Sequence, residues 1–183
     1  VERAQKAAES FGVSLTFGVA DMRMLKEQVE GEFDVVISCD NALPHLLSDE
    51  DLKLAANNLW SKLKPNGLLI ASIRDYDRVI NQKPRSTVPR VFDAPEGNRI
   101  IFQVWDWSED GNTYQVNHFI LRQIEGNWQT QHYKTHYRAL LRYELSQILF
   151  DEGFLEIQWE MPSENGYYQP LVLARKAERP SLP

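Results

Sequence analysis

The residues best suited to chemistry stand in three short polar clusters, each of which follows an apolar run of the chain. They are Asp21, the segment Cys39-Asp40-Asn41 and the segment Arg74-Asp75-Tyr76-Asp77. A planar arginine can hold a carboxylate through two parallel hydrogen bonds, and carboxylates and amides can bind the polar groups of a small ligand. An aspartate after a strand is, taken alone, more often a cap or turn residue than a ligand contact. The three clusters together indicate a small-molecule binding site.

Three predicted strands would bring these clusters to one edge of a sheet. They cover residues 14–19, 33–38 and 68–73, and the last two are apolar runs typical of strands buried on both faces. Between them, Ser48 and Asp51 predict a capped helix start, followed by an apolar stripe over residues 52–63. Lys64-Pro65-Asn66-Gly67 then predicts a turn that ends the helix. Strand–helix–strand order with short turns predicts a right-handed parallel crossover, and ligands bind at the carboxyl ends of such strands.

The remaining elements surround this core. Residues 4–11 predict a helix that ends at Gly12, and residues 78–98 predict a long loop or lid. An antiparallel meander is predicted from strands at 99–107, 113–124 and 128–138, because hairpin-type turns separate them. A helix ending at Gly153 and strands at 155–159 and 170–174 close the chain, and residues 178–183 predict a frayed tail.

Composition excludes several classes of partner. The chain has 183 residues, 43% of them apolar, which predicts one folded domain over residues 1–183. A net charge of −6 with scattered Lys and Arg argues against nucleic-acid and membrane-surface partners. No run is long enough to cross a bilayer, and the lone cysteine, Cys39, fits a cytoplasmic location. We expect a small-molecule partner, and homo-oligomer formation is compatible with the sequence.

A metal site is not expected. His132 and His136 lie on a predicted strand, where a spacing of four residues separates them by ~13 Å. His118 is isolated in the sequence, and one cysteine cannot build a zinc site.

Several of these segments resemble the class I methyltransferases that use S-adenosylmethionine. The resemblance is carried by Phe33-Asp34-Val35-Val36-Ile37, by Leu63-Lys64-Pro65-Asn66-Gly67 with the strand after it, and by the closing pattern around Asp151-Glu152-Gly153-Phe154. It implies an α/β, Rossmann-like sheet that is mostly parallel with an antiparallel last strand. The lid and meander at 78–138 would be an insertion that covers the substrate site.

The chain is most similar to the glycine and sarcosine N-methyltransferase branch of this family. That branch has an Asn followed four residues later by His, which Asn41 and His45 match. It also has an Arg-Asn-Tyr-Asp segment, matched here except that Asp75 replaces the Asn. This resemblance implies S-adenosylmethionine as cofactor and methyl transfer to the amine nitrogen of a small amino acid such as glycine or sarcosine.

The resemblance also implies roles for individual residues. Asp21 would accept a hydrogen bond from the adenine amine and Met22 would pack beside the base. Asp40 and Asn41 would line the methionine moiety near the sulfonium, and Cys39 would also belong to the cofactor site. In the acceptor site, Arg74 would hold a substrate carboxylate, Tyr76 would face the transferring methyl, and Tyr137 would contribute from the meander.

Two of these roles compete with structural ones. For Tyr76, a structural role as a half-buried aromatic residue at a strand end fits the sequence equally well. His45 is the best candidate for a general base, but the sequence slightly favours a structural histidine hydrogen-bonded near a helix start. A neutral amine would attack without a base.

One part of the family pattern is absent from the sequence. The Gly-rich loop and the ribose-binding acidic residue have no counterpart, since Gly12, Gly18 and Gly31 do not form such a loop. In the family sheet, two strands lie between those expected at 14–19 and 33–38. We therefore expect a chain truncated at its N-terminus that lacks the first βαβ unit, although a partner chain or a rearranged sheet could also fill that place.

Three functions remain open. The first is an active N-methyltransferase, the second a noncatalytic relative used for binding or assembly, and the third a nicotinamide-binding oxidoreductase with a similar sheet. The clustered polar residues favour the first. No glycine fingerprint supports the third, and the loop at 40–43 lacks the Pro-Pro-aromatic pattern of enzymes that methylate base or amide nitrogens.

Overall fold

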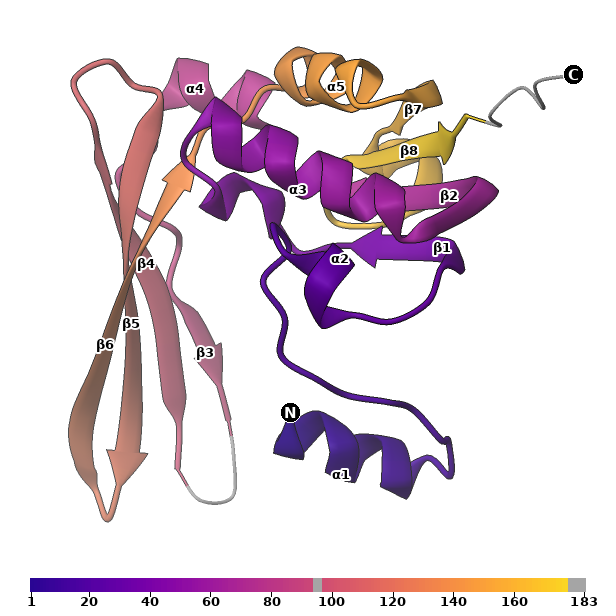
Figure 1. The fold of residues 1–183 in the computed structure, drawn as a ribbon. Coiled ribbons are helices and arrows are strands. Elements are labelled where there is room, and N and C mark those ends of the chain that lie inside the picture. Colours follow the sequence, from indigo (N-terminus) through magenta and orange to yellow (C-terminus); the bar gives the residue numbers. More distant parts are fainter. Residues whose placement is uncertain (94–96, 178–183) are drawn as a thin grey trace, which may run out of the picture.

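The computed structural model describes residues 1–93 and 97–177, which form two four-stranded sheets joined at one end (Figure 1). The mixed sheet has the order β1-β2-β8-β7 and the antiparallel sheet the order β3-β4-β5-β6. The strands are β1 (Phe33–Ser38), β2 (Leu63–Ser72), β3 (Arg90–Phe92), β4 (Arg99–Trp107), β5 (Thr113–Ile124), β6 (Asn127–Arg138), β7 (Phe154–Glu160) and β8 (Leu171–Lys176). The helices are α1 (Glu2–Ser10), α2 (Leu25–Gln28), the 3-10 turn η1 (Leu43–His45), α3 (Asp49–Ser61), α4 (Tyr76–Gln82), α5 (Arg142–Asp151) and α6 (Pro162–Asn165).

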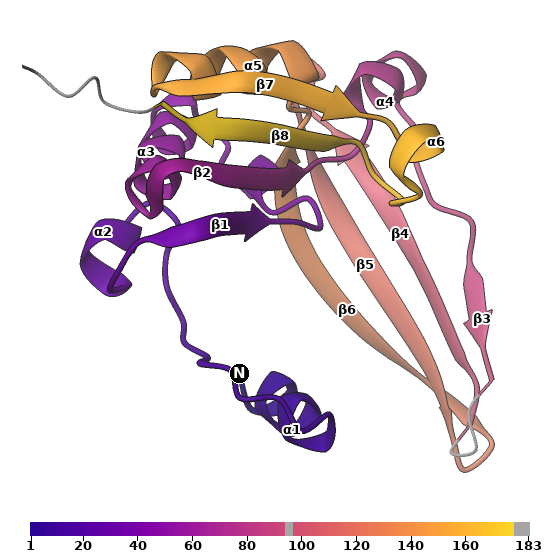
Figure 2. The same cartoon turned by 90° about the vertical axis from the view of Figure 1, so that its right-hand side faces the viewer.

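The predicted parallel crossover is confirmed. β1 and β2 pair in parallel and α3 connects them. Ser48 caps α3, because its hydroxyl accepts a hydrogen bond from the Asp51 amide at 3.1 Å. The stripe of Leu52, Ala55, Ala56 and Leu59 is buried against the sheet. The carboxyl ends of β1 and β2 therefore lie side by side, as the binding-site prediction requires (Figure 2).

The predicted end of the sheet is also confirmed. β8 runs antiparallel to both β2 and β7, so the sheet is mixed with one reversed strand. α5 packs on β7, and the side chain of Phe154 at the start of β7 is completely buried. Within the described residues, no helix is long and apolar enough to cross a membrane.

The three meander strands form as predicted, with a continuous antiparallel register from Arg99↔Arg122 to Trp107↔Tyr114. The loop prediction for residues 78–98 is wrong in two places. α4 continues to Gln82, and β3 adds a short edge strand to the meander through Arg90↔Ile101. The Pro- and Arg-rich composition of the segment did not indicate either element. The side chains of β3 are all exposed, so no buried apolar face marked the strand.

The strand predicted at residues 14–19 does not form. The segment is extended, but none of its backbone groups pairs with a described strand, and Leu15 and Val19 are exposed. A short segment becomes a strand only when a neighbouring edge is present to pair with its backbone groups. The helix prediction at 4–11 is confirmed as α1, although Phe11 is exposed and Ala8 alone of the expected stripe is buried.

β1 and β2 each depart from expectation. β1 is an edge strand, so Phe33, Val35 and Ile37 are exposed rather than buried on both faces. The predicted turn at 64–67 lies inside an irregular start of β2, where the register slips opposite β1 and Asn66 has φ 61°. Gly67 is required there, because a Cβ would lie 2.9 Å from the Lys64 carbonyl oxygen. The predicted frayed tail at 178–183 lies outside the described residues.

Phe154 and Phe150 allow a test of this core. Phe154 is 0% exposed and Phe150 is 60% exposed on the neighbouring helix. Phe154→Ala should lower the free energy of unfolding by about 3–5 kcal/mol, because it leaves a cavity, whereas Phe150→Ala should change it by less than about 0.5 kcal/mol. Urea unfolding followed by circular dichroism measures both, and similar losses for the two variants would contradict the packing described.

Candidate active site

The loop after β1 places an aspartate and an asparagine in unusual backbone conformations. Asp40 and Asn41 both have φ 63°, a left-handed conformation that these two residue types tolerate better than most. The Asn41 side chain is 2% exposed, and its Oδ1 accepts a hydrogen bond from the Arg74 amide at 3.0 Å. The Asp40 amide donates to the Ser72 hydroxyl at 2.8 Å. These bonds fix the loop after β1 against the end of β2.

Two buried tyrosine hydroxyls continue this connection into the meander. Asn41 Nδ2 donates to the Tyr76 hydroxyl at 3.0 Å, and that hydroxyl lies 2.9 Å from the Tyr114 hydroxyl. Arg74 Nη1 donates to the Tyr114 hydroxyl at 2.8 Å. The result is a chain of hydrogen bonds, Asn41–Tyr76–Tyr114–Arg74, which joins the ends of β1 and β2 to α4 and β5. We call it the amide–tyrosine–arginine chain.

The tyrosines of this chain are neutral over a wide pH range. Their side chains are 0% and 1% exposed, and burial is the main reason that the pKa of each lies above its usual value near 10.0. For Tyr76, the neighbouring Tyr114 raises the pKa further. Because both hydroxyls stay protonated, the two tyrosines act as hydrogen-bonding groups and not as bases.

The guanidinium of Arg74 is held between aromatic rings. Its Cζ lies 4.8 Å from the ring centroid of Trp105 and 5.2 Å from that of Tyr137, both on the meander. Such cation–π contacts position a guanidinium without neutralising it. Arg74 forms no ion pair with a carboxylate of residues 1–93 or 97–177. Its charge is therefore not compensated by the part of the chain that is described.

A cavity of ≈ 940 Å³ lies where the mixed sheet meets the meander. Four of the predicted site residues line it: Asp40, Asn41, Arg74 and Tyr137. The Asp40 carboxylate accepts a hydrogen bond from the Tyr168 hydroxyl, which also lies on the cavity wall. We call this space the polar cavity.

The other predicted cofactor residues lie outside the polar cavity. Met22 and Cys39 line an apolar hollow of ≈ 500 Å³ beside β1. Asp21 is engaged by Arg23, which donates from Nη2 at 2.7 Å and from Nε at 3.0 Å. This hydrogen-bonded ion pair lowers the pKa of Asp21 to about 2. Its carboxylate is thus an ionised acceptor that already has a partner.

His45 and Tyr76 lie next to the cavity rather than on its wall. The His45 ring is 4.1 Å from the ring of Tyr137, and its Nδ1 is 3.2 Å from the Thr135 hydroxyl. Partial burial and the nearby charge of Arg74 lower the pKa of His45. Both residues contact groups that line the cavity, Tyr137 and Asn41, and would act on a ligand through them.

Sequence reasoning missed three contributors. Tyr114 links Tyr76 to Arg74 in the amide–tyrosine–arginine chain, and no motif in the sequence singled it out; its alternation with Val116, also buried on β5, is the one signal that could have indicated an inward-facing residue. Tyr168 binds Asp40 from the far end of the sequence. Arg142 pairs with Asp75 at 2.8 Å, so the aspartate at this position has a structural partner on α5. In the described part of the chain, no group of three or more metal-ligating side chains could hold a metal ion.

The buried tyrosines predict the behaviour of the protein in alkali. The unfolded chain loses their protons near pH 10 while the folded chain keeps them, so folding stability should fall as the pH rises above 10. The expected slope is about 1.4 kcal/mol per pH unit for each buried tyrosine. Urea unfolding at pH 8 to 11, with phenolate absorbance as a second signal, measures it.

Tyr143 provides the control for this titration. It is 76% exposed, so Tyr143→Phe should leave the alkaline loss unchanged, whereas Tyr76→Phe should reduce its slope. Reversible ionisation of all seven tyrosines near pH 10 in the folded protein would contradict the burial described.

Comparison with known proteins agrees with the fold and with the sequence motifs. Residues 1–67 match a family model described as a methyltransferase domain. A glycine/sarcosine N-methyltransferase of Parasynechococcus marenigrum is 37% identical over 78 residues, which is 43% of this chain and 28% of that protein. The chain spans less than half the length of each curated relative it matches.

Solved structures extend the likeness over nearly the whole chain. An S-adenosylmethionine-dependent methyltransferase from Clostridium acetobutylicum superposes with a TM-score of 0.76 at 14% identity, covering 96% of this chain and 70% of that one. A sugar N-methyltransferase from a Streptoalloteichus species gives a TM-score of 0.72 at 13% identity, with 96% and 68% covered. The predicted resemblance and fold class are confirmed, while the absence of a first βαβ unit stays a prediction. The chain therefore has the class I S-adenosylmethionine-dependent methyltransferase fold and resembles the glycine/sarcosine N-methyltransferases in sequence.

Proposed function

We propose that the protein transfers a methyl group from S-adenosylmethionine to the amine nitrogen of a small acceptor that bears a carboxylate, such as glycine or sarcosine. The observation that carries this proposal is the position of Arg74. Its guanidinium lines the polar cavity, is oriented by two aromatic rings and has no carboxylate partner among the described residues. A planar, always charged donor in this state is suited to a ligand carboxylate.

The cofactor assignment is supported by the path of the loop after β1. Ser38, Cys39 and Ala42 line the apolar hollow, while Asp40 and Asn41 line the polar cavity. The hollow, which also contains Met22, is suited to an apolar ring system, and the cavity carries carboxylate, amide and hydroxyl groups suited to a charged amino-acid moiety. One ligand with both parts fits this donor set. When bound, the cofactor supplies a methyl group activated by positively charged sulfur.

Asp21 supports a narrower role than the resemblance implies. Its carboxylate already accepts three hydrogen bonds from Arg23, two from the guanidinium and one from the backbone amide, and it lies on neither cavity wall. Spare lone pairs remain on its oxygens, so a further donor such as an adenine amine can be accommodated only beside Arg23. We propose that Asp21 and Arg23 act together at the adenine end.

The contribution of the protein to the chemistry is mainly positioning. Arg74 would bind the acceptor carboxylate and so fix the amine at the opposite end, which reduces the entropic cost of reaching an in-line arrangement. The amine must be neutral to attack. The lowered pKa of His45 keeps its imidazole neutral near pH 7, so it can take up a proton, relayed by solvent, that an acceptor ammonium releases.

Tyr76 is proposed to hold Asn41 rather than to touch the methyl group. Its hydroxyl is fully buried and bonded to Asn41 and Tyr114, and it is not on the wall of the polar cavity. The meander would exclude water from the acceptor, which favours displacement at carbon by the amine over competing reactions.

The first test is calorimetric titration of S-adenosylmethionine and S-adenosylhomocysteine. It should use this chain and, where the natural chain continues beyond residue 1, the extended form. Saturable binding of both ligands to at least one of these forms is expected. A folded protein that binds neither would contradict the proposal and would leave a noncatalytic role.

The second test is Arg74→Lys, which keeps the charge but loses the planar fork. The KM for a carboxylate-bearing acceptor should rise at least about tenfold, because bidentate charge-assisted hydrogen bonds are lost. The affinity for S-adenosylmethionine should stay within about twofold, since Arg74 is assigned to the acceptor alone.

Arg175→Lys is a suitable control for this test, because Arg175 lies on β8 and pairs with Glu156 away from both cavities. The melting temperature of each variant separates loss of binding from loss of folding. An equal fall in both affinities for Arg74→Lys would refute the acceptor role.

A further inference from the structure

The wall of the polar cavity carries more positive charge than one carboxylate needs. Besides Arg74, the cavity is lined by Arg78 from α4 and Arg90 from β3. Neither forms an ion pair or a side-chain hydrogen bond with any other residue of 1–93 or 97–177. Their guanidinium groups are therefore available to a ligand.

The acidic residues on the same wall offset these charges only in part. Asp75 is paired with Arg142 at 2.8 Å, and Asp40 accepts the hydroxyl of Tyr168. Asp75 is thus neutralised by Arg142, whereas Asp40 keeps its charge because its partner is a neutral hydroxyl. Three arginines without an ion pair among the described residues therefore outweigh the single Asp40 carboxylate, and the net positive charge of the wall attracts anions.

His118 adds an oriented donor to this wall. The indole Nε1 of Trp105 can only donate, and it donates to Gln103 Oε1 at 3.0 Å. The Gln103 amide nitrogen, 3.2 Å from His118 Nδ1, is then the donor to that ring nitrogen. In neutral His118 the hydrogen is consequently on Nε2. Gln103 and His118 both line the cavity, so the fixed tautomer provides an N–H group beside the arginines.

The positive charge continues along the same face of the meander. Arg99 and Arg122 occupy directly opposite positions on β4 and β5, two residues beyond the Ile101↔Ile120 pair and therefore on the face that carries His118. Like charges placed directly opposite are unfavourable in a sheet. Arg99 Nε is also buried without a hydrogen-bond partner among the described residues. Such an arrangement is stabilised when an anion is nearby.

Arg90 and His118 lie at a distance from Arg74 along the meander. Arg74 stacks on Trp105, whereas Arg90 pairs with Ile101, four residues further along β4. Four strand residues span ~13 Å, and His118, opposite Gln103, lies about halfway. A single small carboxylate held at Arg74 would therefore leave Arg90 and His118 without an anion. The volume of ≈ 940 Å³ is also close to the upper limit of cavities that bury a drug-sized ligand.

The geometry points to an acceptor with two anionic groups: a carboxylate at Arg74 and a second carboxylate or a phosphate at Arg78, Arg90 and His118. This inference rests on the proposed function, since it names the class of acceptor for the same cavity. It differs from the glycine-type acceptor in requiring a second anion beside Arg90 and His118, whose partners on β4 lie about 7–13 Å along the strand from the Trp105 that contacts Arg74.

Binding of three amines to the protein tests the inference. The probes are glycine, L-glutamate and O-phospho-L-serine, titrated by calorimetry at a fixed ionic strength of about 0.15 M so that screening is constant. At least one dianionic probe should bind at least about tenfold more tightly than glycine, the gain expected from one charge-assisted hydrogen bond or more. Preference for glutamate identifies a carboxylate, and preference for phosphoserine identifies a phosphate.

The double variant Arg78→Gln/Arg90→Gln should remove this preference. The affinity for the preferred dianion should fall to within about twofold of that for glycine, while glycine binding itself should be unchanged. Arg85→Gln is the matched control, because Arg85 is exposed in the same segment but does not line the cavity. Both changes are at exposed side chains, so folding should be retained.

Two results would overturn the inference. One is equal affinity for all three probes, and the other is a preference for dianions that survives the double variant. Methyl transfer to glycine without any preference for dianions would refute the second anion site and leave the proposed function intact. A preference lost in the double variant, together with no methyl transfer to any amine, would keep the anion site and refute the proposed function.

Discussion

The amide–tyrosine–arginine chain is the constraint on which the rest of the structure depends, because it is a buried polar link between the two sheets within the hydrophobic core that they share. Asn41 comes from the loop after β1, Arg74 from the end of β2, and Tyr114 from β5. Each such bond contributes only about 1 kcal/mol net, but an unmade one would cost ~1–3 kcal/mol, since its partner would stay buried. The meander is therefore held in one position over the strand ends, and the polar cavity exists because of that position.

Local patterns predicted the elements that depend on local forces. The meander strands at 99–107 and 113–124 and the capped start of α3 were found because alternation, hairpin turns and a Ser–Asp capping pair act within a few residues. Residues 14–19 were predicted wrongly for the opposite reason: strand formation requires a distant partner, which the residues themselves do not reveal. The same holds for β1, whose exposure follows from its place at the sheet edge.

The strand-end rule placed Asp40, Asn41 and Arg74 in one cavity without any knowledge of the structure. It could not supply Tyr114, whose contact with Arg74 depends on the registers of the meander and on how the meander is attached. Asp21 was different, since Arg23 is only two residues away and the pair could have been recognised as local. Long-range polar contacts are thus the part of a site that sequence patterns leave out.

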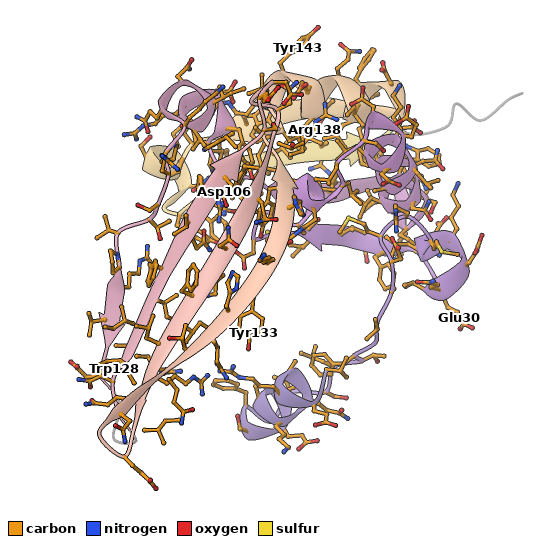
Figure 3. The ribbon with its side chains drawn as sticks, turned by 90° about the vertical axis from the view of Figure 1, so that its left-hand side faces the viewer. Glu30, Asp106, Trp128, Tyr133, Arg138 and Tyr143 are labelled. Carbon is orange, nitrogen blue, oxygen red and sulfur yellow. The ribbon has the colours of Figure 1, made fainter. Side chains whose placement is uncertain are left out.

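The meander is attached to the mixed sheet at one end, and its other end extends far from that attachment. Figure 3 shows β6 extending from Arg138, beside α3 and α5, to Trp128 near its far tip. β5 and β6 each have 12 residues and therefore measure ~40 Å. A rotation of about 5° at the attached end would move the tip by roughly 3.5 Å, given that strand length. A small change where Tyr114 meets Arg74, near the attached end, would therefore be amplified at the far end of the meander.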